Sequence, residues 1–259
     1  MLTQPTPYPD VNEILALLLT RVEQILGSQF VGLYLYGSLA SGDFDPASSD
    51  IDFAVVTTGS LPSATASALE AMHMDLYAGG PAWAKKLEGS YLPAALIRRH
   101  DPQGAACPSI NEGHFYIAPR GSDWIIQRHV LRETGVIVKG PQPRTLIDPV
   151  SPEQIRQAVL GVLDEWWFPM LDDPTWLRDN GPHYQAYAVI TMCRVLHALA
   201  HGTIVSKPVA ASWVRARYGA RWNALIDTAL TAQSADVPAF LDEAVSFIRF
   251  TKEQIGTIP

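Results

Sequence analysis

Residues 37–53 read GSLASGDFDPASSDIDF and lie between two short apolar runs, at residues 31–36 and 53–56. Both runs consist mainly of apolar and aromatic residues and are bounded by Gly, Ser and Pro, as buried strands are. Side chains alternate across a strand, so Asp50 and Asp52 should leave on one face while Ile51 points into the core. We therefore predict two core strands, joined by a small-residue turn that ends in a pair of carboxylates.

The two carboxylates indicate a cation site. With no Lys or Arg close in sequence, converging aspartates repel each other unless a cation lies between them. Mg²⁺, held by one or two carboxylates and by substrate phosphates, meets that need. The alternative is an ordinary strand connection with surface acids, because Asp is common in turns. The combination of Gly37-Ser38 with Ser49-Asp50-Ile51-Asp52 between two strands resembles the polymerase-β-type nucleotidyltransferase superfamily.

Composition indicates a globular protein that is long enough for two domains. The chain has 259 residues, 47% of them hydrophobic and 17% charged. The apolar run at residues 14–19 is too short to span a bilayer, no secretory signal precedes it, and Cys107 and Cys193 form no disulfide or zinc pattern. We therefore expect a cytoplasmic protein with no membrane partner. Its net charge of −7 argues against a nucleic-acid partner and suits a cationic substrate, and a monomer is the favoured state.

Hydrophobic periodicity divides the chain near residue 146. Residues 1–146 are expected to form an α/β nucleotidyltransferase domain with a mixed sheet and flanking helices, in which residues 98–121 are a long connection. Residues 147–259 are expected to form an all-α helical bundle, because apolar residues recur there at helical spacing. The predicted helices are 10–26, 62–76, 123–133, 184–201, 209–218, 222–233, 239–255 and one that begins at Ser151-Pro152.

Metal-assisted nucleotidyl transfer needs acids for the cation, donors for the triphosphate and a base for the acceptor hydroxyl. The two aspartates suit the first role. Gly37 and Ser38 suit the second, because a glycine lets the backbone approach phosphate closely. Glu88, in an extended segment, is the best candidate for the base, while Glu70 and Asp75 compete from a helical stretch.

A second resemblance covers most of the chain. The aminoglycoside 3''-adenylyltransferases of the streptomycin and spectinomycin type resemble it in several motifs. These are Tyr36-Gly37-Ser38, Ser49-Asp50-Ile51-Asp52, Leu87-Glu88, Val138-Lys139-Gly140-Pro141, Thr191-Met192-Cys193-Arg194 and residues 202–213, GTIVSKPVAASW. Those antibiotic-resistance enzymes join a nucleotidyltransferase domain to a helical bundle, with ATP and drug bound between them. The resemblance implies transfer of AMP from ATP to a hydroxyl of a small molecule, an aminoglycoside or aminocyclitol, with the helical domain closing the cleft.

The resemblance also assigns roles to residues. It implies that Asp50, Asp52 and Glu88 bind Mg²⁺ and that Glu88 is the general base. Gly37, Ser38, Ser49, Arg194 and Lys207 are implied to bind the nucleotide. The residues themselves agree in part, since Arg194 interrupts an apolar helix where a cation needs a partner, and Lys207 stands at a helix start suited to anions. A solvated loop lysine is the alternative for Lys207.

The acceptor side departs from the family. The family's Gly-Glu-Trp corresponds at best to Gly113-His114-Phe115, so the aromatic wall of the acceptor pocket is expected at Phe115 or Tyr116. An acidic drug-contacting residue corresponds to Tyr184-Gln185, which makes Tyr184 an expected acceptor contact. The chemistry of transfer is thus better supported than the identity of the acceptor.

Two further residue patterns in the helical half are compatible with other functions. His197 and His201 are four apart and could ligate zinc, but no third ligand is evident. Arg194 and His201 also have the spacing of the HEPN ribonuclease motif, which suggests a toxin–antitoxin-type protein acting on RNA or a protein partner. A basic surface signal is missing for that alternative. A non-catalytic nucleotide sensor is disfavoured by the intact acids.

Overall fold

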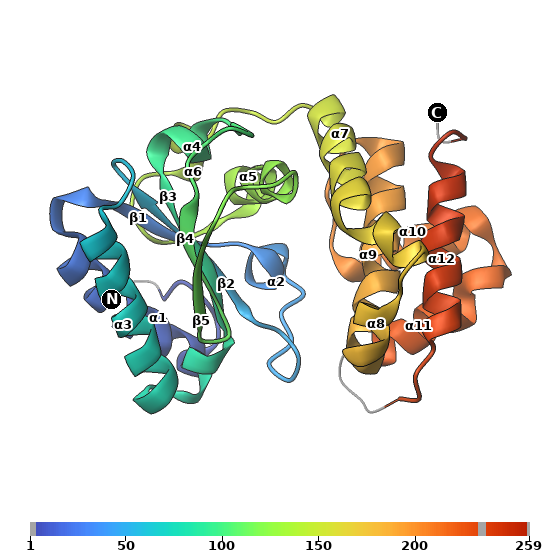
Figure 1. Cartoon of the computed structure of the whole chain (residues 1–259), viewed down its shortest axis with the longest axis horizontal. Helices are drawn as coiled ribbons and strands as arrows, with labels where there is room; N and C mark the ends of the chain where they lie inside the picture. The colour runs from blue at the N-terminus through green and yellow to red at the C-terminus, as the bar shows by residue number, and fades with distance from the viewer. Residues whose placement is uncertain (1–3, 233–236, 258–259) are drawn as a thin grey trace. The chain divides into compact units, whose positions relative to one another are not determined.

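The computed structural model describes residues 4–232 and 237–257, which form two compact units, Met1–Pro149 and Val150–Pro259. The first unit has a mixed sheet with flanking helices and the second is helical (Figure 1). The predicted fold class is confirmed. Within the described ranges, none of the helices combines the length and the apolar character that crossing a membrane requires.

The first unit is built on a six-stranded sheet with the order β5-β4-β3-β2-β1-β6. The strands are β1 (Phe30–Leu35), β2 (Ile51–Thr57), β3 (Leu87–Pro93), β4 (Cys107–Asn111), β5 (His114–Ala118) and β6 (Val136–Lys139). Strands β2 and β3 run parallel, and the other neighbouring pairs are antiparallel. The parallel pair is connected by helix α3, as parallel neighbours require a crossover.

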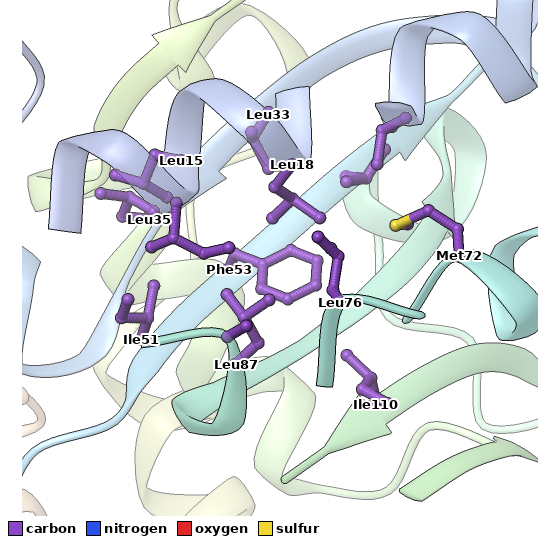
Figure 2. Packing of buried hydrophobic residues seen from close by; sticks show 14 of the residues in the cluster. Leu15, Leu18, Leu33, Leu35, Ile51, Phe53, Met72, Leu76, Leu87 and Ile110 are labelled. Carbon is purple, nitrogen blue, oxygen red and sulfur yellow. The ribbon is translucent and has the colours of Figure 1, made fainter. Parts of the chain in front are cut away.

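Helices cover both faces of this sheet. Alternate residues of β2, among them Ile51 and Phe53, pack with α1 (Pro9–Leu26) and α3 (Ser63–Gly79) in one hydrophobic core (Figure 2). The other face packs against α5 (Asp123–Thr134) and α4 (Ala94–Arg98). The shorter elements of the unit are α2 (Gly37–Ser41), α6 (Pro143–Leu146) and the 3₁₀ turns Gly27–Gln29 and Ala82–Lys86.

The expectation of a long connection at residues 98–121 is wrong. Strands β4 and β5 form an antiparallel hairpin there, in which Asn111 pairs with His114. Glu112 and Gly113 make the two-residue turn, with φ of 45° and 85°. Positive φ at both positions matches the twist of hairpin strands. Asn-Glu-Gly-His lacks the usual Asn-Gly signal, and β5 is too exposed to show clear alternation, so the sequence hid this hairpin.

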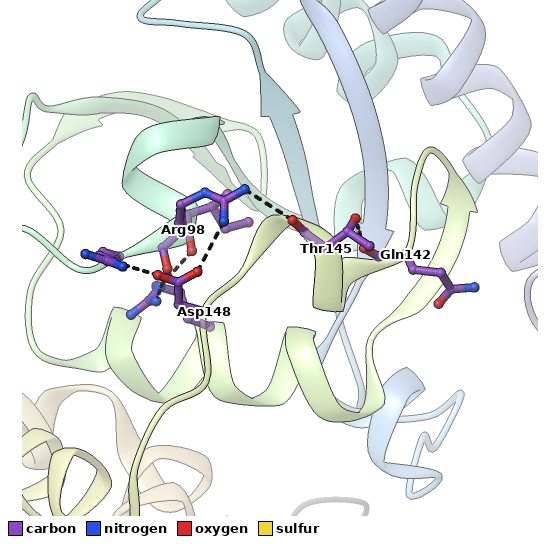
Figure 3. Close-up of polar contacts among 7 residues, drawn as sticks. Arg98, Gln142, Thr145 and Asp148 are labelled. Atoms are coloured by element: carbon purple, nitrogen blue, oxygen red, sulfur yellow. Dashed lines mark hydrogen bonds and ion pairs between the residues drawn. The ribbon is translucent and has the colours of Figure 1, made fainter.

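Arginines tie the last residues of the first unit to its body. Asp148 accepts hydrogen bonds from Arg98 Nη1 (3.2 Å) and Arg99 Nε (2.6 Å), and Arg98 Nη2 reaches the Thr145 carbonyl at 3.2 Å (Figure 3). The Thr145 hydroxyl in turn donates to the Gln142 carbonyl at 2.7 Å. Chain as far as Asp148 is therefore held by the α/β unit.

The second unit is organised around α9 (Gly181–His201), which packs against its neighbours α7, α8, α10, α11 and α12. These helices are α7 (Pro152–Val162), α8 (Thr175–Asp179), α10 (Lys207–Tyr218), α11 (Asn223–Thr231) and α12 (Leu241–Gln254), with short turns at Leu163–Trp167, Phe168–Leu171 and Ala220–Trp222. Helix α7 begins at the predicted Ser151-Pro152 start with a capping box: the Ser151 hydroxyl accepts from the Gln154 amide, and Gln154 Oε1 accepts from the Ser151 amide. The predicted helix at 222–233 ends at Thr231 within α11, and its last residue lies outside the described ranges.

Candidate functional site

The parallel pairing of β2 and β3 brings two of the predicted acids together. In this register Asp52 lies directly beside Glu88. Both side chains belong to the face opposite Ile51 and Phe53, which are buried in the core. Two carboxylates that are far apart in sequence are thus neighbours at one end of the sheet.

Gly37 is fixed by its contact with Asp52. Its φ is +59°, and a Cβ at this position would lie 1.8 Å from Asp52 Oδ2. The Tyr36 amide also donates to the Asp52 carbonyl at 3.0 Å. A glycine is therefore required here for two reasons, the left-handed backbone and the closeness of the carboxylate. We predicted Gly37 from phosphate approach alone.

A cavity of about 190 Å³ opens beside the acid pair. Asp52 and Glu88 line one part of it, and the aromatic residues Tyr36, Tyr116 and Trp124 line others, together with Arg120, Asp123 and Gln127. The sequence did not reveal Arg120, Asp123 or Gln127, since their proximity to Glu88 depends on how β5 and α5 fold back over the sheet. An aspartate at the start of a helix is too common to signal a site.

Glu88 has the properties of a base. Burial raises the pKa of Glu88 from 4.5 to about 7. Negative charges on Asp50, Glu112 and Asp123 add to the rise. A carboxyl group with a pKa near neutrality can take a proton from a hydroxyl that is being activated, and pass through both protonation states at neutral pH.

Asp50 is held apart from that pair by a lysine. Lys86 Nζ lies 3.2 Å from Asp50 Oδ1 and 3.1 Å from Glu112 Oε1. Our premise that no cation is near the aspartates is wrong, because Lys86, the residue directly before β3, forms an ion pair with Asp50, the residue directly before β2. Among the described residues, no three His, Cys, Asp or Glu side chains are grouped as a metal site.

Arg120 is anchored in the sheet. Its guanidinium donates to Ser90 Oγ (2.9 Å), to Ser109 Oγ (2.8 Å) and to the carbonyls of Cys107 and Ala118, and it lies over the Trp124 ring at 5.2 Å. These bonds hold the end of β5 against β3 and β4. Most N–H groups of Arg120 therefore already donate to groups of the sheet.

Phe115 does not have the position that we expected. It packs against the core cluster between the sheet and α3, with its ring 6.2 Å from that of His73. Tyr116, the next residue, lines the cavity. Side chains alternate along β5, so only one of these two rings can face Glu88. Phe115 therefore belongs to the core, whereas Tyr116 lines the cavity and remains the candidate for the aromatic wall.

The two predicted nucleotide-binding serines are near the acids. Ser38 lies in α2, directly after Gly37. The Ser49 hydroxyl accepts a hydrogen bond from the Asp45 amide at 3.0 Å, and the Ser49 amide donates to the Asp45 carbonyl at 2.8 Å. Ser49 therefore closes the turn that leads to Asp50.

The second unit carries the predicted cations on two packed helices. Arg194 lies in the middle of α9, and its Nε is a buried atom without a hydrogen-bond partner in the described part of the chain. Lys207 is the first residue of α10. A buried guanidinium nitrogen that lacks an acceptor is consistent with a site that receives one from a ligand.

The two residues at the start of α9 have different environments. Tyr184 is exposed and its ring lies 4.8 Å from that of Trp176, whose ring is 5.2 Å from Trp166. Gln185 is buried, accepts from the Phe240 amide at 2.7 Å and donates to the Leu177 carbonyl. Gln185 is therefore a structural residue, whereas Tyr184 belongs to an exposed aromatic group that the sequence did not reveal.

The histidine pair serves packing. The rings of His197 and His201 lie 4.6 Å apart, and both meet the edge of Trp213. Desolvation lowers the pKa of His197, and the neighbouring His201 adds to that shift. Among the described residues, no further His, Cys, Asp or Glu joins the pair in a group that could hold a metal ion.

Comparison with known proteins agrees with this geometry. Residues 16–79 match a family model described as a nucleotidyltransferase domain, and residues 145–252 match the C-terminal domain of the aminoglycoside adenylyltransferases. The chain is therefore an adenylyltransferase-like protein with a nucleotidyltransferase domain. These matches confirm both predicted resemblances. This nucleotidyltransferase is an enzyme of the adenylyltransferase-like kind.

Similar proteins share both halves of the nucleotidyltransferase. An aminoglycoside (3'') (9) adenylyltransferase of Klebsiella pneumoniae is 26% identical over 92% of each chain. A spectinomycin 9-adenylyltransferase of Campylobacter jejuni is 23% identical over 95% of this chain and 94% of its own. The crystal structure of spectinomycin adenyltransferase AAD(9) from Enterococcus faecialis with ATP and spectinomycin shares the fold, with a TM-score of 0.73 at 15% identity, covering 96% of this chain and 99% of that one.

Proposed function

We propose that this nucleotidyltransferase moves AMP from ATP to a hydroxyl of an aminoglycoside or aminocyclitol in a Mg²⁺-dependent reaction. The observation that carries the proposal is the pairing of Asp52 with Glu88 at the cavity, where burial raises the pKa of Glu88 to about 7. Both carboxylates suit a cation and Glu88 also suits a proton, as the transfer requires. The names of the similar adenylyltransferases supply the nucleotide and the acceptor class.

In the proposed reaction the acceptor oxygen attacks the α-phosphorus of ATP. A bond forms between these two atoms, the bond from the α-phosphorus to its bridging oxygen breaks, and pyrophosphate leaves with that oxygen. Glu88 takes the proton of the acceptor hydroxyl. Burial raises the pKa of Glu88 and so favours the protonated carboxyl, which suits this group to accept that proton.

The acids fit a bound Mg²⁺ by their chemistry, since hard cations take carboxylate oxygens. Asp52 and Glu88 would hold it, with Asp50 as third ligand once Asp50 leaves Lys86. When bound, the ion neutralises charge on the phosphates and the leaving group. Gly37 keeps Asp52 in place, because any side chain at that position would displace the carboxylate.

The remaining predicted residues are assigned to the phosphates, except Tyr184, which is assigned to the acceptor. Ser38 follows the glycine turn and offers a hydroxyl and an amide, while Ser49 shapes the loop that presents Asp50. Arg194 and Lys207 supply positive charge, and the unpaired Arg194 Nε supports a phosphate oxygen as its acceptor. Tyr184, beside Trp176, offers an aromatic surface for a sugar ring.

The test is a matrix of nucleotides and acceptors. Purified protein is incubated with Mg²⁺, one of ATP, GTP, CTP or UTP, and spectinomycin, streptomycin or another aminoglycoside, and the products are weighed by mass spectrometry. We expect a mass gain of one AMP on an aminoglycoside or aminocyclitol with ATP, and none when EDTA is present. Pyrophosphate release without any modified acceptor would contradict the proposal.

A further inference from the structure

The lysine beside Asp50 bridges two carboxylates. Lys86 Nζ lies 3.2 Å from Asp50 Oδ1 and 3.1 Å from Glu112 Oε1. The sheet order accounts for this arrangement, because β3 lies between β2 and β4. Lys86 directly precedes β3, Asp50 directly precedes β2, and Glu112 directly follows β4. One ammonium therefore offsets the charge of a predicted metal ligand and of a carboxylate that the transfer chemistry does not use.

The two contacts of the lysine differ in kind. The Lys86 ammonium donates a hydrogen bond to Glu112, whereas Asp50 Oδ1 is a buried atom that accepts none from residues 4–232 and 237–257. The contact with Asp50 is thus one of opposite charge without a hydrogen bond. Buried polar atoms are nearly always satisfied, so this oxygen is open to a metal ion, which takes carboxylate oxygens as ligands. Lys86 is bonded to Glu112 and only offsets the charge of Asp50.

The turn that carries Glu112 fixes the place of its carboxylate. Among the described residues, Glu112 is the only non-glycine residue with a positive φ, 45°. Glycine or asparagine takes this conformation at lower cost. The Glu112 amide donates to the Leu87 carbonyl at 3.3 Å, which ties the turn to β3 next to Lys86. A glutamate thus stands where its backbone conformation is unfavourable, and its side chain makes the hydrogen bond with the lysine.

We propose that Lys86 is a resident counter-ion of the metal site, which gives up Asp50 to a divalent cation and is then retained by Glu112. The ammonium competes with the cation for Asp50, so the free enzyme binds the cation weakly until the phosphates of the nucleotide add their oxygen ligands. Glu112 reduces this competition, because its bond to the ammonium survives the loss of Asp50. Both are positioning residues, since neither touches the reacting atoms. The inference rests on the proposed function, whose Mg²⁺ is the cation in question.

A double-mutant cycle tests the role of Glu112. Electron paramagnetic resonance of free Mn²⁺ gives the Kd of the full-length protein without nucleotide, so no turnover is needed. We expect Glu112→Gln to raise this Kd about fivefold to tenfold in the wild type, because the released ammonium turns to Asp50. In the Lys86→Met background the same change should raise the Kd only about twofold, the share due to the charge of Glu112 acting at a distance. Glu70→Gln, which removes an exposed charge on α3, should leave the Kd unchanged.

Lysine and aspartate variants complete the test. Lys86→Met should lower the Kd for Mn²⁺ about threefold to tenfold, whereas Lys85→Met, which removes an ammonium that lies over an aromatic ring of α3, should not. If Lys86→Met does not lower the Kd, or if Glu112→Gln has the same effect in both backgrounds, the inference is overturned while the proposed function stands. Asp50→Asn and Asp52→Asn should each weaken Mn²⁺ binding. If neither does, these acids do not hold the cation, and the metal site of the proposed function fails together with the inference.

Discussion

Replacing Glu88 by Gln should make the protein more stable at neutral pH while it abolishes transfer. The pKa of Glu88 is raised from 4.5 to about 7, mainly because the folded chain buries the group. Below about pH 4.5 the carboxyl is protonated in both the folded and the unfolded state, so its burial carries no charge penalty. Between about pH 4.5 and 7 the unfolded chain loses the proton first, and the free energy of unfolding falls as the pH rises.

The size of the effect follows from the shift. About 2.5 pKa units at 1.36 kcal/mol per unit gives about 3 kcal/mol above pH 7, as an upper limit because the side chain is partly exposed. Glu88→Gln keeps the shape of the side chain and removes the charge. The free energy of unfolding of the variant should therefore exceed that of the wild type by nearly this value at pH 8, and the difference should vanish near pH 4.5. The same variant should lose about 10²-fold or more in kcat.

Urea unfolding at several pH values measures this difference, followed by tryptophan fluorescence and extrapolated linearly to water. Glu70→Gln is the matched control, since Glu70 lies exposed on α3 and no pH-dependent gap is expected there. All measurements are made without divalent cations, because a bound cation would favour the charged carboxylate. A Glu88→Gln protein less stable than the wild type at pH 8, or a gap that does not vary with pH, would refute the reasoning.

Other variants test the acid site and the second unit. Gly37→Ala should abolish transfer and should destabilise the protein by about 1–2 kcal/mol more than Gly42→Ala does, as measured by urea unfolding. Both glycines have positive φ, but only Gly37 abuts Asp52. Equal losses of stability in the two variants would contradict this contact. Lys86→Met should tighten the binding of Mn²⁺, because the Lys86 ammonium no longer competes with the ion for the Asp50 carboxylate. Electron paramagnetic resonance without nucleotide measures this binding. Weaker binding would show that the lysine supports the site. Arg194→Gln should raise the ATP KM about tenfold or more and leave the acceptor KM unchanged. An unchanged ATP KM would show that Arg194 does not bind the nucleotide.

The sequence drew attention to the acids because their pattern is local. Asp50 and Asp52 stand two residues apart beside a strand, and Glu88 follows an apolar residue in another strand, so alternation alone gives their faces. The parallel register of β2 and β3 is not encoded locally, and it decides both the pairing of Asp52 with Glu88 and the contact between Asp50 and Lys86. The sequence therefore named the acids without revealing the lysine.

The acceptor side was harder for the same reason. Phe115 and Tyr116 are adjacent aromatics in a strand that shows no clear alternation, and only the hairpin with β4 determines which ring faces the cavity. Asp123 and Arg120 reach the cavity through the packing of α5 and β5, which no short motif describes. Gln185 looked like a substituted ligand, but its hydrogen bonds belong to the interior of the helical unit.

The most direct test of the central claim uses two parallel reactions, one with ATP labelled on the α-phosphate and one with ATP labelled on the γ-phosphate. With Mg²⁺ and spectinomycin or streptomycin, label on the α-phosphate should appear in the modified drug and label on the γ-phosphate in pyrophosphate, and Asp52→Asn should abolish both. The surface variant Glu70→Gln should behave as the wild type. Label from the α-phosphate in RNA or in protein, with the drugs unmodified, would contradict the account and favour a toxin–antitoxin-type activity.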